Sequence, residues 1–141
     1  MTKIRREDAP ALLLKMLLEA AEHITELYDM PAEEAVRTEH PIVDTFDVLG
    51  DALAQPIIVP ELRAEAPDAD LLRRCFDCTE LLLTSPSSVL REAAYFQILE
   101  ALLGENVPYA QAFPYKRSHT RQRALKMLDG YDVERPEGAE S

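Results

Sequence analysis

The chain has 141 residues, with 15 Lys and Arg against 26 Asp and Glu, and a formal net charge of −11 at pH 7. This length suits one domain built around one hydrophobic core. The charge argues against a general nucleic-acid binder and against docking on anionic lipid, because both functions need clustered cations. An acidic surface instead attracts basic partners.

The first half of the chain is predicted to contain two long helices. Apolar residues recur at helical spacing over residues 10–28, where Asp8 is the expected N-cap, and again over residues 42–54. Between them, residues 32–38 are expected to form a short helix.

A proline-rich connector follows the second helix. Pro56 and Pro60 predict an extended segment over residues 55–60, because a residue before proline avoids the α region. The apolar side chains of this segment are expected to reach the core. A short turn of helix is expected over residues 61–66.

The next two helices are predicted to form an antiparallel pair. One begins near Asp68 or Asp70 and ends near residue 84, and residues 85–88 supply the turn and the next cap. The other covers residues 87–103 and is apolar on most sides. Such a helix lies either at the centre of a bundle or under a partner.

The C-terminal part is predicted to contain a loop, a helix and a tail. Residues 106–115 read as a proline-broken loop with aromatic anchors, and residues 118–128 as a fifth helix. We therefore expect a helical domain over residues 1–130 and a flexible C-terminal tail over residues 131–141.

These patterns predict an all-α fold, a single-domain bundle of about five helices. The antiparallel pair resembles one unit of a helical-repeat (HEAT-like) fold, so part of the bundle could follow that architecture. The charged start MTKIRREDAP predicts no signal peptide, and no segment approaches the ~20 apolar residues of a membrane span. A cytoplasmic protein is expected.

Both cysteines of the chain lie in the stretch Cys75-Phe-Asp-Cys78. A thioredoxin-type site places its first cysteine at a helix N-terminus after a strand, whereas Cys75 is predicted to lie in mid-helix. A structural zinc site usually needs four ligands, and only three scattered histidines could add to this pair. We interpret both cysteines as small core residues, and we expect neither metal nor cofactor.

Two carboxylate pairs suggest one enzymatic alternative. The spacing of Glu19 and Glu22, followed by Asp44 and Asp47, resembles the all-helical nucleotide pyrophosphohydrolases of the MazG type. The resemblance implies Mg²⁺ bound between two helices. Helical geometry, however, turns each pair away from the apolar side of its own helix, as in an ordinary solvated face. We therefore predict no catalytic residues.

Charge is distributed unevenly along the chain. Residues 22–51 hold nine acids against Arg37 alone, about −8 in one region. This is either a solvated face or a surface that steers a basic partner. Between residues 106 and 128 there are five cations and no acid. The cations near residues 118–120 could bind an anion at a helix start, although such cations more often pair with acids elsewhere in the domain.

The segment LLRRCFDCTELLLTSPSSVLREAAYFQILEALL, with FDVLGDALAQ before it and RQRALKML after it, resembles small uncharacterised all-helical bacterial proteins of the immunity-protein type. The resemblance implies a stoichiometric inhibitor that binds a toxin domain and blocks it. The alternatives are a regulatory or adaptor helical domain with another partner, and the MazG-like hydrolase.

On the immunity hypothesis, the acidic region would contact a basic bacterial toxin domain. The predicted partner-binding residues are Glu33, Glu34, Asp44, Asp47 and Asp51. Tyr28 or Met30 is expected to supply an apolar anchor. No nucleic-acid or membrane partner is expected, and the sequence leaves the oligomeric state open.

Overall fold

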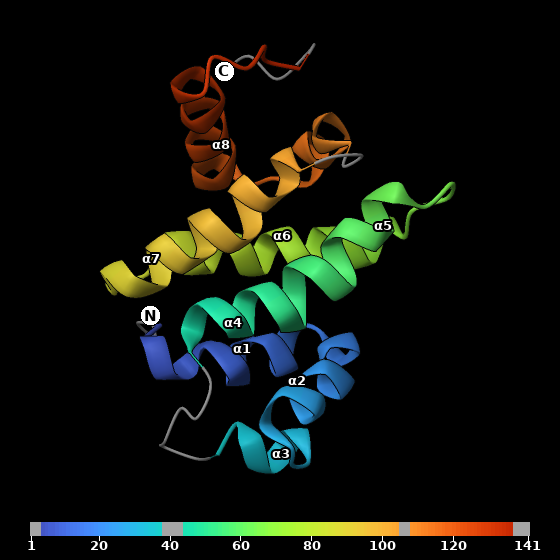
Figure 1. Ribbon diagram of the computed structural model, residues 1–141, viewed down its shortest axis with the longest axis vertical. Helices are drawn as coiled ribbons and strands as arrows, with labels where there is room; N and C mark the ends of the chain where they lie inside the picture. The colour runs from blue at the N-terminus through green and yellow to red at the C-terminus, as the bar shows by residue number, and fades with distance from the viewer. Residues whose placement is uncertain (1–3, 38–43, 105–107, 137–141) are drawn as a thin grey trace.

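The computed structural model describes residues 4–37, 44–104 and 108–136. All regular elements in these ranges are helical, and no strand occurs among them, which confirms the predicted all-α fold. Figure 1 shows one elongated stack of helices, with α3 (Ala32–Ala35) at one end and α8 (Ser118–Gly130) at the other. The helical-repeat architecture stays a prediction.

The first predicted helix is broken in the middle. Leu17 adopts extended backbone angles (φ −137°, ψ 90°), so the prediction of one continuous helix over residues 10–28 is wrong at this position. The break lets the first part pack on α6 (Ala69–Leu83) while the second part packs on a different helix. The elements before and after the break are η1 (Arg6–Asp8), α1 (Ala9–Met16), η2 (Leu18–Ala20) and α2 (Ala21–Tyr28).

Arg74 on α6 stabilises this break. Its guanidinium donates to the backbone carbonyl of Met16 at 3.3 Å, a carbonyl that lies just before the interruption. It also donates two bonds to the Glu19 carboxylate, at 2.9 and 2.8 Å. These hydrogen bonds lower the pKa of Glu19 to about 2. A charged side chain of a neighbouring helix thus binds the polar groups at the helix break.

A continuous helical segment runs through the predicted proline connector. It comprises α4 (Thr45–Leu49), the π-helical η3 (Gly50–Ile58) and α5 (Val59–Arg63). The prediction of an extended chain over residues 55–60 is therefore wrong. Pro56 lacks the N–H that an α-helix would use, and the wider π-helical turns around it accommodate that loss.

The apolar side chains of that segment reach the core as expected. Ile57, Ile58 and Val59 are each 5% exposed or less. The predicted start of this helix at residue 42 lies outside the described residues. Within them, Asp44 is the N-cap, and its carboxylate accepts a hydrogen bond from the Phe46 N–H at 2.8 Å.

The predicted antiparallel pair forms with the expected caps. Asp68 accepts a hydrogen bond from the Leu71 N–H at the start of α6, and Ser87 accepts one from the Leu90 N–H at the start of the next helix. That second helix consists of α7 (Ser88–Ala94), a π-helical turn η4 (Tyr95–Leu99) and η5 (Glu100–Leu103), and Gly104 follows it.

The C-terminal part contains a helical element that the sequence does not predict. η6 (Tyr109–Tyr115) is a 3₁₀-helix where a loop is predicted. The described part of the tail folds back on the body, because Tyr131 donates to Glu100 and the Tyr109 hydroxyl donates to the Glu134 carbonyl.

The buried residues form two clusters. The main core draws on every helix from α1 to α7, and it contains Cys75 and Cys78, both fully buried. Because both cysteines are buried, the prediction that they are core residues is confirmed. The same burial raises the pKa of the Cys78 thiol to about 12. A smaller second cluster joins α8 to the body through Leu99, Phe113, Ala124, Leu125, Met127 and Leu128.

Candidate functional site

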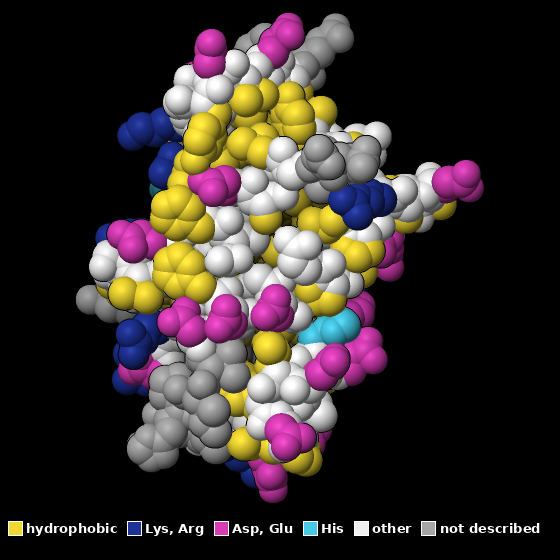
Figure 2. Space-filling view, in the orientation of Figure 1, with side chains coloured by type: hydrophobic (Ala, Val, Ile, Leu, Met, Phe, Trp, Pro, Cys, Tyr) yellow, Lys and Arg dark blue, Asp and Glu magenta, His cyan; other side chains and the backbone are white. Residues whose placement is uncertain are grey.

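Three exposed carboxylates lie on one side of the α4–η3 helix. Asp44, Asp47 and Asp51 follow each other at spacings of three and four residues, which places them on one face of a helix. Among the residues that the structure describes, no ion pair involves any of the three. We call this set the acidic row. Figure 2 shows acidic side chains in a row across this face, directly below hydrophobic ones.

An aromatic ridge adjoins the acidic row. Phe46, which lies between Asp44 and Asp47 in the sequence, stacks on Phe96 with ring centroids 6.4 Å apart. Phe96 in turn meets Tyr95 edge to face at 4.9 Å. The Phe96 side chain is 45% exposed, although it is large and apolar. The aromatic ridge of Phe46, Phe96 and Tyr95 is therefore a hydrophobic surface beside the three carboxylates of the acidic row.

The ridge depends on close packing between two helices. A side-chain carbon added at Gly50 would lie 2.7 Å from the amide oxygen at the end of the Gln97 side chain, so η3 and η4 lie close together here. The approach brings Phe46 and Phe96, which are distant in sequence, into contact. Neither ring is among the predicted site residues. The sequence did contain one sign of this exposed aromatic surface, because the helix over residues 87–103 is apolar on most of its sides.

The five predicted partner-binding residues do not form a single patch. Glu33 and Glu34 are exposed, but they lie on α3 at the end of the molecule, whereas α4 lies on the other side of α1 (Figure 1). The expected anchors are also placed differently. Tyr28 is 5% exposed and belongs to the core, and Met30 is half-buried against it. The aromatic ridge is the apolar surface next to the acidic row.

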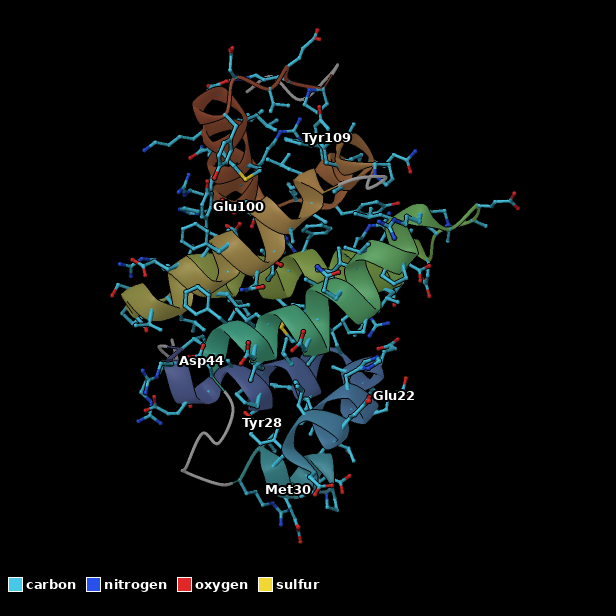
Figure 3. The ribbon with its side chains drawn as sticks, viewed as in Figure 1. Glu22, Tyr28, Met30, Asp44, Glu100 and Tyr109 are labelled. Atoms are coloured by element: carbon cyan, nitrogen blue, oxygen red, sulfur yellow. The ribbon has the colours of Figure 1, made fainter. Side chains whose placement is uncertain are left out.

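The two carboxylate pairs of the enzymatic alternative are not gathered at one point. Glu19 is bound by Arg74, and Figure 3 shows Glu22 on α2 at the opposite side from Asp44. Within residues 4–37, 44–104 and 108–136, no group of three or more His, Cys, Asp or Glu side chains is placed to hold a metal ion.

The predicted anion site at the start of α8 is occupied by a side chain of the same chain. The Glu80 carboxylate accepts hydrogen bonds from the His119 and Thr120 N–H groups, at 3.2 and 2.8 Å, and from the Thr120 hydroxyl at 2.9 Å. Burial raises the pKa of Glu80, but these bonds more than offset it and hold the pKa below its usual range. Arg117 pairs with Asp77 at 2.8 Å. The donor groups at the start of α8 therefore bind acidic side chains of the same domain instead of a free anion.

No helix in the described part of the chain is both long and apolar enough to cross a membrane. Comparison of the whole sequence with protein-family models and with curated proteins, and of the fold with solved structures, finds no match.

Proposed function

We propose that this chain is a non-enzymatic protein-binding domain that binds a basic partner through its acidic row and aromatic ridge. The observation that carries the proposal is the juxtaposition of three exposed carboxylates, which form no ion pair with any residue that the structure describes, with the 45%-exposed Phe96. Interfaces commonly combine an aromatic anchor with a charged rim, and the rim charges accelerate association with an oppositely charged partner.

The specific form of the proposal is an immunity protein that neutralises a basic bacterial toxin. It is supported by the resemblance of residues 42–128 to small helical immunity-type proteins and by the net charge of −11. A toxin that cleaves nucleic acid needs cations to hold its substrate, and an acidic inhibitor can cover those cations. An adaptor role with another basic partner would use the same surface.

The first test is growth rescue in bacterial cells. The probe is the product of the gene immediately upstream, expressed alone and together with this chain. An immunity protein restores growth, and the variant Asp47→Lys/Asp51→Lys loses most of this protection. The control Glu65→Lys/Glu134→Lys makes the same change of net charge at exposed positions outside the surface. A harmless neighbour contradicts the immunity role, and equal rescue by both variants removes the acidic row from the interface.

The second test measures association kinetics with the same purified partner. Reversing Asp47 and Asp51 should slow association at low salt by about tenfold or more and flatten its salt dependence, because steering by opposite charges is screened by salt. The control variant should keep the wild-type salt dependence. Unchanged kinetics would remove the acidic row from the interface. A separate measurement tests the hydrolase alternative: a rise in the melting temperature only when Mg²⁺ and a nucleotide are both added would favour it.

A further inference from the structure

A basic groove lies next to the aromatic ridge, between α7 and α8. It has a volume of about 680 Å³, and Tyr95 and Phe96 form part of its wall. Three cations line it, Arg91, Arg123 and Lys126, against a single acid, Glu92. Although the chain has a net charge of −11, this groove has a local excess of positive charge, which attracts acidic groups.

Two of the cations are held in place before any ligand arrives. The Arg123 guanidinium lies 3.9 Å from the centroid of the Tyr95 ring, and Arg91 donates to the Ser85 carbonyl at 2.7 Å. His119, which also lines the groove, is held by Glu80 with its Nδ1 2.8 Å from the carboxylate. Side chains fixed in this way lose little conformational entropy on binding, which favours a specific contact with an acidic surface.

Phe96 belongs both to the groove and to the aromatic ridge. Its ring lines the groove and stacks on Phe46, which the acidic row flanks. The surface therefore runs from acidic row, through aromatic ridge, to basic groove. A twofold axis through the middle of such a surface brings the acidic row of each copy onto the basic groove of the other, so that this contact forms twice. The aromatic ridges of the two copies then stack on each other near the axis.

We propose that two copies of this chain form a symmetric dimer around Phe96, with the acidic row of each copy in the basic groove of the other. The surface fits a second copy because the row and the groove carry opposite charge: three carboxylates face three cations and one acid. The dimer covers the acidic row, so a basic partner must displace the second copy. Self-association would thus keep the partner-binding surface closed until that partner is present.

The experiment uses paired charge reversals and sedimentation equilibrium at low salt. Wild-type protein should dimerise, and both Asp47→Lys/Asp51→Lys and Arg123→Glu/Lys126→Glu should raise the dimer dissociation constant by at least tenfold. Mixed in equal amounts, these two variants should form a heterodimer, because the two reversed regions carry opposite charge and the two unchanged regions also carry opposite charge. One chain carrying all four substitutions should dimerise again, and high salt should dissociate the wild type.

Several outcomes would overturn the proposal. A wild-type monomer at low salt, a dimer that the reversals leave intact, or variants that fail to pair when mixed would each do so. Lys126→Glu alone, at an exposed position, should weaken the dimer by a smaller factor. This single variant shows that the effect does not come from misfolding of the double variant. Arg123→Glu/Lys126→Glu leaves the acidic row intact, so it separates failure of the dimer from failure of binding to a basic partner.

Discussion

At the scale of single residues, Lys116 departs most from what its type predicts. It is 9% exposed, and its ammonium lies 4.3 Å from the centroid of the Phe113 ring and 4.9 Å from that of Phe76. Burial, reinforced by the charge of Arg121, lowers the pKa of Lys116 to about 7. The folded protein therefore holds this proton less tightly than the unfolded chain, where the pKa stays near 10.5.

This pKa shift predicts that stability rises with pH between about 7 and 8.5. In that window the folded state loses the Lys116 proton while the unfolded state keeps it, so the free energy of unfolding should increase by about 1–2 kcal/mol. Lys116→Met should remove this contribution and be more stable than wild type at pH 7. Urea unfolding at about pH 7 and about pH 8.5 measures the free energy of unfolding at the two ends of this window. The control Lys126→Met, at an exposed site, should behave as wild type. An equal rise of the free energy of unfolding with pH in all three proteins would contradict the assignment of this effect to Lys116.

At the scale of elements, two helix ends are secured by side chains from α6. Arg74 binds the carbonyl of Met16 at the break before α2, and Glu80 caps the first turn of α8. Both contacts join residues about 40 or more positions apart, so local sequence patterns carry no sign of them. The positions of α2 and α8 are thus set partly by polar contacts to the central helix.

Glu80→Gln should lower the free energy of unfolding by about 1–3 kcal/mol, because the amide keeps the shape but loses the negative charge at a helix N-terminus. The pKa of Glu80 is lowered in the folded state, so its stabilisation is present above the ordinary carboxyl pKa and is lost as pH falls through the folded pKa. Wild type and variant should therefore converge in acid. Urea unfolding measures the difference, with Glu92→Gln at an exposed position of α7 as the control. Equal losses for both variants would argue against the cap.

At the scale of the whole molecule, the division of the core into two clusters predicts uneven local stability. The main core gathers residues from α1 to α7, whereas α8 supplies four of the six residues of the second cluster and packs there on Leu99 and Phe113. Helices with less buried apolar contact open at lower free energy. Amide hydrogens of α8 should exchange faster than those of α6, even though both helices are long and regular.

The matched variants for this prediction are Leu128→Ala in the second cluster and Leu72→Ala in the main core, both at fully buried leucines. Leu128→Ala should speed exchange mainly in α8, whereas Leu72→Ala should speed it throughout the chain, since each truncation costs about 2–5 kcal/mol in the unit that contains it. Hydrogen exchange followed by mass spectrometry resolves the helices. Uniform acceleration by both variants would mean that the two clusters unfold as one unit.

The sequence by itself determined the all-α class, the caps at Asp68 and Ser87, and the burial of the cysteine pair. These features depend on local periodicity and on side chains a few residues apart, which any helix of this sequence would share. It also identified Asp44, Asp47 and Asp51 as one exposed face, because helical spacing alone fixes that relation.

Only the tertiary structure decided where helices break or continue and which surfaces adjoin. The break at Leu17 and the π-helical passage through Pro56 bury apolar residues against distant helices, and that burial overrides local backbone preference. The pairing of Phe46 with Phe96 likewise depends on two helices meeting at Gly50. A surface made of residues fifty positions apart comes into existence only when the core closes, because core packing fixes the relative placement of its helices.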